Sequence, residues 1–186
     1  IQVAAPESAE CEVSAKIINI KLLNFNVMQI KLSVDNLEPW FPGQDLSLIN
    51  PEDTMRNYSI ANIPAQEGFI ELHVKIYPGG SMGQWLANKA TKDTQVKLRG
   101  PFGRCFYYNP DQLAFDMLLA GTGTGLAPLI AIIKSALSQN HQGRITLVHG
   151  GLTDEDIYYR EELDMLSAVF SSFIYDPCVL QSQGDY

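Results

Sequence analysis

Cysteine is scarce in this sequence. The three cysteines, Cys11, Cys105 and Cys178, lie far apart and match the ligand spacing of neither a zinc site nor an iron–sulfur cluster. We therefore expect no metal site, and three ordinary thiols in a reducing cytoplasm.

Long apolar runs and positive charges are scarce as well. The longest strongly apolar run, residues 126–133, contains Pro128 and is far shorter than the roughly 20 residues that a membrane span needs. Lysine and arginine number 13 against 21 aspartates and glutamates, and the net charge of -8 repels nucleic-acid phosphates. With 46% hydrophobic and 18% charged residues, the composition predicts a globular protein without a membrane span or a nucleic-acid partner.

Up to about residue 110, short β-rich runs alternate with turn signals such as the Pro-Gly-Gly at 78–80. Alternation of apolar and polar residues over 69–76 is typical of a strand with one buried face. Apolar residues at helical spacing behind Ser81 predict one short helix over 81–88. The expected strands lie over 11–20, 27–34, 45–50, 56–60, 69–76 and 95–99, and they predict a small antiparallel barrel.

After residue 110 the pattern changes to strands that alternate with helices. The expected strands lie over 117–120, 145–149 and 173–175, and the expected helices over 128–137 and 159–168. A βαβαβ unit of this kind has parallel strands. The sequence therefore predicts a linker over 1–9, a barrel domain over 10–110 and an α/β domain over 111–186.

A glycine-rich turn opens the α/β domain. In residues 118–128, LLAGTGTGLAP, an apolar strand runs through Gly121, Gly123 and Gly125 into a helix. Glycines let the backbone approach a pyrophosphate closely, and the N–H groups at the helix start can bind it. A tight turn without a ligand is the alternative, because such motifs often match by chance.

A second motif, Arg56-Asn57-Tyr58-Ser59, lies at the end of a barrel strand. An arginine can hold a diphosphate through two hydrogen bonds, a tyrosine can lie flat on an aromatic ring system, and a serine hydroxyl can bond a ring nitrogen. Together these groups suit a flavin dinucleotide. Taken singly, they also fit a surface charge, a core ring and a hydroxyl at a strand end.

The motifs RNYS at 56–59, GPFG at 100–103 and GTGTGLAP at 121–128 resemble the ferredoxin-NADP reductase superfamily in order and spacing. The resemblance covers essentially the whole chain. It implies a flavin-binding antiparallel β-barrel followed by a Rossmann-like α/β domain that binds a nicotinamide nucleotide. It also implies hydride transfer from NADH or NADPH to FAD, and an electron-acceptor protein such as an oxygenase, a [2Fe-2S] ferredoxin or a fused ferredoxin domain.

The resemblance also assigns roles to single residues. Arg56 would bind the flavin phosphates, Tyr58 would stack on the isoalloxazine ring, and Ser59 would bond near its hydride-accepting nitrogen. Thr124 would contact the nicotinamide, with helix capping as the alternative reading of the local sequence. Ser59, Tyr58 and Thr124 are thus the expected catalytic residues. Further FAD contacts are expected from Asn57, Val74, Lys75, Tyr77, Gly80, Ser81, Met82 and Gly83, the last by its backbone because the family often has serine there.

The loop after the second α/β strand bears on the choice of nucleotide. Relatives often have a basic residue there for NADP, whereas this chain has Leu152 followed by Asp154, Glu155 and Asp156. Acidic groups would repel a 2′-phosphate and could accept a hydrogen bond from a free 2′-hydroxyl, which favours NADH. A solvated acidic cap at the start of the next helix is the alternative.

Both ends of the chain differ from the family pattern. The family's later C-G-P-x-x-M element is absent, so we expect an incomplete nucleotide-binding domain. The chain begins at Ile1, and residues 2–10 resemble the linker that follows an iron–sulfur domain in oxygenase reductases. Two alternative functions stay open, a flavin reductase that releases reduced flavin and a non-catalytic flavin-binding module.

Overall fold

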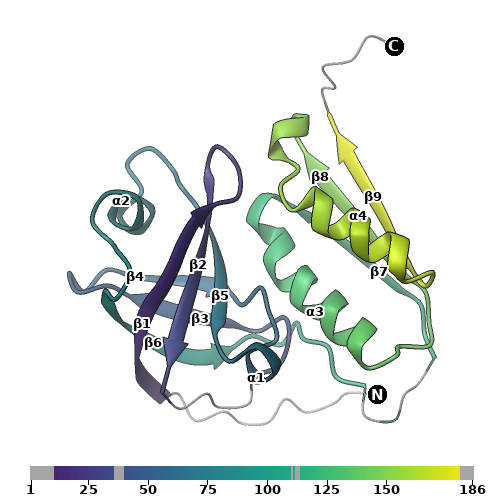
Figure 1. Cartoon of the computed structure of the whole chain (residues 1–186), viewed down its shortest axis with the longest axis horizontal. Helices are drawn as coiled ribbons and strands as arrows, with labels where there is room; N and C mark the ends of the chain where they lie inside the picture. The colour runs from purple at the N-terminus through teal and green to yellow at the C-terminus, as the bar shows by residue number, and fades with distance from the viewer. Residues whose placement is uncertain (1–10, 36–39, 110, 112–113, 181–186) are drawn as a thin grey trace.

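The computed structural model describes residues 11–35, 40–109, 111 and 114–180. The predicted linker over 1–9 and residue 110, at the predicted domain boundary, lie outside the described residues. Figure 1 shows a β-rich body beside an α/β body, with α3 between the barrel strands and the second sheet.

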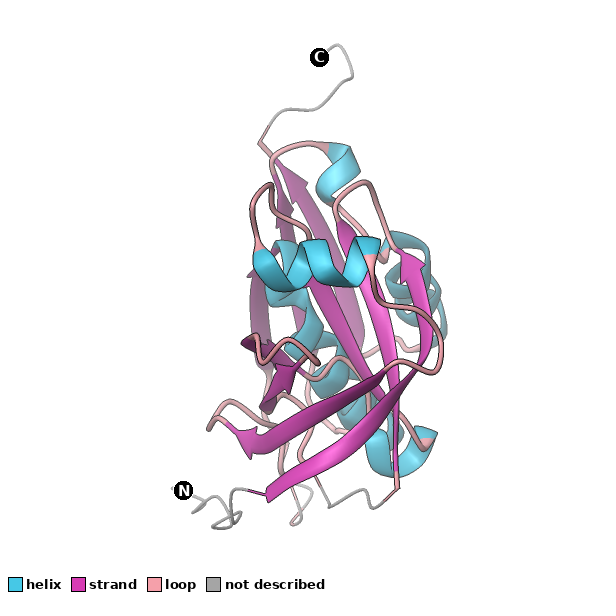
Figure 2. Cartoon of the chain, turned by 90° about the vertical axis from the view of Figure 1, so that its left-hand side faces the viewer, coloured by secondary structure: helices cyan, strands magenta, loops and turns pink. Residues whose placement is uncertain are grey.

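The first body is an antiparallel sheet of six strands in the order β4-β3-β6-β1-β2-β5. The sheet closes on itself because Ile60 forms a bridge to Leu72 of β5, and the amide of Ala61 donates to the carbonyl of Glu71 at 2.8 Å. The strands twist strongly across one another (Figure 2), and the predicted antiparallel barrel is confirmed. The strands are β1 (Cys11–Leu22), β2 (Val27–Val34), β3 (Asp45–Ile49), β4 (Met55–Ser59), β5 (Ile70–Lys75) and β6 (Gln95–Phe102).

The apolar faces of these strands fill one core, which contains fully buried Ile17, Ile30, Leu72 and Leu98. Helix α2 (Ser81–Asn88) forms at the predicted residues and adds Trp85 to this core. A short helix that was not predicted, α1 (Pro64–Glu67), begins at a proline, whose fixed backbone angle suits the first helical position.

The second body is a sheet in the order β7-β8-β9, and its strands run parallel, as predicted. Its core joins both helices to the inward residues of the sheet, such as Leu147 and Phe173. On the other face of the sheet, Leu118 is 74% exposed and Ile174 is 43% exposed. The elements are β7 (Met117–Thr122), α3 (Leu126–Ser138), β8 (Ile145–Gly151), α4 (Arg160–Val169) and β9 (Phe173–Val179). Among the described residues, no helix has the length and apolarity that crossing a bilayer takes.

The prediction that strand β5 has only one buried face is wrong. Glu71 and His73, which alternate with its apolar residues, are each only 2% exposed. The α/β domain covers this second face, where the His73 ring lies 5.4 Å from that of Tyr158 and 5.5 Å from that of Tyr159, between centroids. The alternation of apolar and polar residues within one strand cannot show that its polar face is covered by a second domain. Strand β5 is therefore the seam between the two domains.

Candidate functional site

A groove of about 640 Å³ at the edge of the barrel collects most of the residues predicted to bind FAD. It joins strand β4, the end of β5 and the start of α2 to the glycine loop of the α/β domain. Gly79 is the one lining residue that was not predicted, although it belongs to the predicted turn at 78–80. The groove is lined by Arg56, Asn57, Tyr58, Lys75, Tyr77, Gly79, Gly80, Ser81, Met82, Gly83 and Thr124.

One end of this groove suits a diphosphate. The Arg56 guanidinium donates to the carbonyl of Met55 at 2.7 Å and to Oγ of Ser81 at 3.3 Å, which holds it beside the first turn of α2. Gly80 precedes this helix and provides no side-chain cap. The first N–H groups of a helix have no intrahelical partner and lie at its positive end. The guanidinium and these N–H groups can therefore donate hydrogen bonds to the same diphosphate, one from each side.

The glycine at position 83 has a packing reason. A Cβ atom there would lie 3.3 Å from the carbonyl oxygen of Lys75 and 3.4 Å from Cα of Ile76. The missing side chain therefore lets α2 begin close against the end of β5. Only the backbone of Gly83 is available to a ligand, as expected.

Tyr58 supplies the flat surface of the groove. Its ring is half-buried against the barrel core. Burial raises the pKa of its phenol to about 12, although the nearby Arg56 charge acts in the opposite direction. The phenol is therefore neutral at physiological pH, and its ring face is free to stack on a planar ligand.

Two of the expected flavin contacts do not line the groove. Ser59 follows Tyr58 in β4, and successive strand residues point to opposite faces, so its side chain lies opposite that of Tyr58 and beside Asp45 of β3. The Val74 side chain is fully buried in the barrel core, which leaves only its backbone for a ligand contact.

A second groove, of about 540 Å³, adjoins the first. The two grooves share three lining residues, Lys75, Tyr77 and Thr124. The Lys75 ammonium lies 5.6 Å from the centre of the exposed Tyr77 ring. Two ligands bound in the two grooves would therefore meet at these side chains. Several of the other lining residues belong to the glycine loop and to the loop after the second α/β strand, both of which the sequence singled out. These other residues are Thr122, Gly123, Gly150, Gly151, Leu152, Asp156 and Leu180.

The three glycines of the loop differ in their surroundings. Gly123 has φ +50° and lines the second groove. Gly121 lines neither groove, and a Cβ atom there would lie 2.8 Å from Cδ1 of Leu129, so this glycine allows the loop to pack on α3. Gly125 has open space where a Cβ atom would be. Thr124 does not cap α3, because the residue before that helix is Gly125 and no side-chain cap is present.

The acidic loop serves largely as a local cap. Oδ2 of Asp156 accepts hydrogen bonds from the amides of Leu152 at 3.2 Å and Thr153 at 3.0 Å, as part of a capping box. Asp154 forms an exposed ion pair with Arg160 at 3.4 Å. Of the three acidic residues, only Asp156 lines the second groove.

Comparison with known proteins places both domains in families. Residues 14–107 match the oxidoreductase FAD-binding domain, and residues 118–184 match the oxidoreductase NAD-binding domain. The ferredoxin–NAD(P)+ reductase component of a Pseudomonas putida naphthalene 1,2-dioxygenase system is 27% identical over 84% of this chain and 47% of its own length. NADH-cytochrome b5 reductase 1 of Dictyostelium discoideum is 32% identical over 70% of this chain and 46% of its own length. The chain thus spans about half the length of these curated relatives.

A solved structure, a cytochrome P450 reductase of Amycolatopsis, superposes with a TM-score of 0.85 at 26% identity, over 94% of this chain and 54% of its own. The groove geometry agrees with both family matches. The Arg56 guanidinium at the uncapped start of α2 suits the pyrophosphate of FAD. The adjoining groove lies at the glycine loop, where an NAD-binding domain would hold its nucleotide. The chain therefore belongs to the ferredoxin-NADP reductase superfamily, with an FAD-binding barrel and an NAD(P)-binding α/β domain.

Proposed function

We propose that this chain is the flavin- and nucleotide-binding part of a cytoplasmic reductase that passes electrons from a nicotinamide nucleotide through FAD to a partner protein. The observation that carries the proposal is the pair of adjoining grooves, which share Lys75, Tyr77 and Thr124. This arrangement lets an electron donor and an electron acceptor lie in contact, as hydride transfer requires. FAD supplies the redox chemistry when bound.

The chain's own residues have binding and orienting roles in this proposal. Arg56 and the first N–H groups of α2 hold the two phosphates, and the Tyr58 ring covers one face of the flavin ring. Thr124 orients the nicotinamide at the junction of the grooves. Ser59, which the resemblance implied as a contact of the ring edge, does not line the flavin groove and has no contact with the ring in this proposal. We also propose the predicted domain limits, 10–110 and 111–186, which are wider than the ranges that match the two families.

The proposed electron donor is NADH. Lys75 is the only cation that lines the second groove among the described residues, and it lies at the flavin end. The side near Leu152 instead has the carboxylate of Asp156. A 2′-phosphate placed there would meet a like charge and no basic partner, whereas a free hydroxyl meets no such penalty.

The proposed acceptor is an iron–sulfur protein or an oxygenase. The support comes from relatives such as the naphthalene 1,2-dioxygenase reductase component and the reductase component of phenol 2-monooxygenase from Pseudomonas, which is 29% identical over 88% of this chain. A [2Fe-2S] ferredoxin, free or fused to the same protein, is the specific partner that we propose.

The uncovered face of the second sheet favours one further candidate, a flavin-binding module without reductase activity. Leu118 and Ile174 are exposed on that face, which no helix covers among the described residues. Such a module would bind FAD normally, but neither nucleotide would bleach the flavin absorbance.

Anaerobic titration of the FAD-loaded chain with NADH and with NADPH separates these functions. The proposal expects flavin bleaching at lower NADH than NADPH concentration. Arg56→Ala should weaken FAD binding roughly 10- to 100-fold, because it removes charge-assisted hydrogen bonds to phosphate. Arg144→Ala, which removes an exposed cation that lines neither groove, is the matched control. A chain that takes up no FAD would overturn the proposal.

A further inference from the structure

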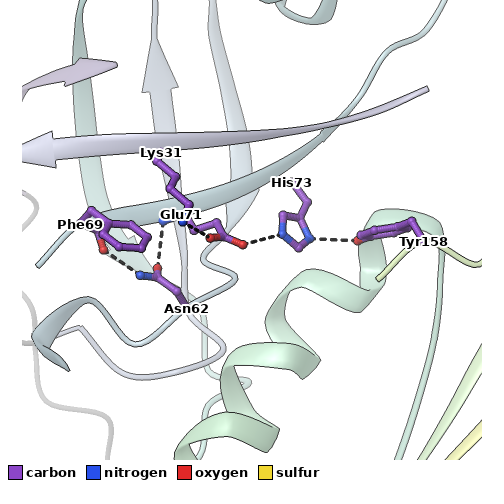
Figure 3. Close-up of polar contacts among 6 residues, drawn as sticks. All are labelled: Lys31, Asn62, Phe69, Glu71, His73 and Tyr158. Carbon is purple, nitrogen blue, oxygen red and sulfur yellow. Dashed lines mark hydrogen bonds and ion pairs between the residues drawn. The ribbon is translucent and has the colours of Figure 1, made fainter. Parts of the chain in front are cut away.

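Three polar side chains form a buried chain of hydrogen bonds across the seam between the domains. Glu71 and His73 lie on β5 of the barrel, and Tyr158 lies just before α4. Nε2 of His73 is 2.9 Å from Oε1 of Glu71, and Nδ1 of His73 is 3.1 Å from the Tyr158 hydroxyl (Figure 3). The three residues are only 2%, 2% and 3% exposed, so each broken bond would leave a polar group without water.

The charge on Glu71 sets the direction of the hydrogen bond between His73 and Glu71. Burial raises the pKa of Glu71, but the hydrogen bond and the charge of His73, a hydrogen bond from Gln29 and the charge of Lys134 on α3 outweigh burial and hold the pKa below its ordinary value. The Lys31 ammonium also lies 3.6 Å from Oε2 of this carboxylate. An ionised carboxylate only accepts, so Nε2 of His73 donates to Glu71. Nδ1 accepts from the Tyr158 hydroxyl in the neutral ring and donates to it in the protonated ring.

Two members of this chain, His73 and Tyr158, lie close to the proposed site. Lys75 lies two residues after His73, on the same face of β5, and lines both grooves. Its Nζ is 4.0 Å from where a Cβ atom of Gly123 would be, so β5 and the glycine loop meet there. The Tyr158 ring lies edge-on to His149, 5.9 Å between centroids. His149 directly precedes Gly150 and Gly151 of the second groove.

We propose that the hydrogen bond between Tyr158 and His73 positions the nucleotide groove against the flavin groove, so that a bound nicotinamide lies at reacting distance from the flavin ring. Tyr158, His73 and Glu71 are thus positioning residues, which act through Lys75 and the 149–151 strand end. The inference rests on the proposed function and adds the contact that sets the domain geometry. A misplacement of the reacting atoms by about 1 Å can slow a reaction roughly 100-fold. The loss of one buried hydrogen bond at the seam can therefore have a measurable effect on the rate.

Tyr158→Phe tests this inference, because it removes only the hydroxyl and keeps the ring packed on His149. Tyr175→Phe is the matched control, since the Tyr175 hydroxyl also bonds a histidine, Nδ1 of His149 at 3.1 Å, but within the α/β domain. We expect Tyr158→Phe to slow the limiting rate of flavin reduction by NADH roughly 10- to 100-fold. FAD affinity and flavin reduction by dithionite should stay unchanged, and Tyr175→Phe should change the rate much less.

Hydrogen exchange provides a readout that needs no nucleotide. Backbone amides of 70–75 and 157–160 should exchange faster in Tyr158→Phe than in the wild-type chain, and Tyr175→Phe should leave the 70–75 amides unchanged. An unchanged limiting rate in Tyr158→Phe would overturn the inference. If the wild-type chain binds FAD but neither nucleotide reduces it, the proposed function fails, and hydrogen exchange alone then decides. If the amides of both segments exchange at the same rates in Tyr158→Phe as in the wild-type chain, the inference that this hydrogen bond positions the domains is overturned.

Discussion

The two domains bury their apolar residues in different ways. The barrel wraps around its core, so residues such as Leu72 and Leu98 are fully buried by strands of the same sheet. The sheet of the α/β domain is covered on one face, and Leu118 is 74% exposed on the other. The core of this domain also extends to Val27 of strand β2 in the barrel. We infer that flavin binding depends mainly on the barrel, which supplies every lining residue of the flavin groove except Thr124, whereas the second groove has lining residues from both domains.

The largest effects should come from truncating one core at a time. Leu72→Ala in the barrel and Leu147→Ala in the α/β domain each replace a fully buried leucine. Each should lower the free energy of unfolding of its own domain by roughly 2–5 kcal/mol, through lost burial and the cavity left behind. Leu72→Ala should release FAD, whereas Leu147→Ala should retain FAD and lose reduction by NADH. Thermal unfolding followed by circular dichroism measures the loss of stability, and flavin fluorescence during the same unfolding measures the release of FAD.

Leu118→Ala is the control for these truncations, because the exposed leucine loses little burial. Its unfolding temperature and FAD affinity should match those of the wild-type chain. The comparison between the domains breaks down if Leu147→Ala releases FAD as readily as Leu72→Ala does.

As the pH falls, the α/β domain should lose stability at a higher pH than the hydrogen bonds at the seam do. His149 is fully buried, and burial, together with the Arg160 charge, lowers its pKa from 6.5 to about 4. Between these values the unfolded chain binds a proton that the folded chain does not, so stability falls as pH falls through this window. The loss approaches ~3 kcal/mol of unfolding free energy. The pKa of Glu71 is also lowered, but from an ordinary value of 4.5, so the stability that its carboxylate provides is complete above pH 4.5 and is lost only at lower pH.

Urea unfolding at a series of pH values across this window, with probes in each domain, measures the effect. His149→Gln removes the titrating group while keeping a polar side chain, and it should flatten the pH dependence of the α/β domain. An equally steep pH dependence in His149→Gln would assign the acid sensitivity to another group.

Local pattern was sufficient to predict most elements of the fold. Strand β2 and helix α2 lie at the predicted residues because alternation and helical spacing are strong there. Strands β7 and β8 run two residues further than predicted, because Gly121 pairs with His149 and Thr122 with Gly150 in the parallel ladder. Glycines favour loops when seen alone, and only the pairing partner shows that they extend a strand.

The first groove could be predicted and the second only in part, for a similar reason. Residues 56–58 and 80–83 are contiguous motifs, so their types and order carry the prediction. Gly150 and Leu180, in contrast, join the glycine loop only through the parallel sheet. The bond between His73 and Tyr158 spans 85 residues, and the polar face of β5 suggested solvent rather than a second domain.

The smallest effect should come from Gly125→Ala, which separates the two readings of the glycine loop. The backbone of Gly125 has φ -61° and ψ -15°, which alanine adopts readily, and its Cβ atom would meet open space. Alanine should therefore stabilise the free chain by about 0.4–1 kcal/mol, because it restricts the unfolded chain. If this open space receives the pyrophosphate of the nucleotide, as the superfamily resemblance implies, the added methyl group should weaken NADH binding a few-fold.

Gly121→Ala sharpens this test. Its Cβ atom would lie 2.8 Å from Cδ1 of Leu129, so it should destabilise the α/β domain whether or not a nucleotide binds. Isothermal titration with NADH, beside thermal unfolding of the free chain, separates the loss of affinity from the loss of stability. Unchanged NADH affinity in a stabilised Gly125→Ala would mean that this glycine serves the turn alone. FAD affinity should stay nearly constant in both variants, since neither glycine lines the flavin groove and all of its lining residues except Thr124 belong to the barrel.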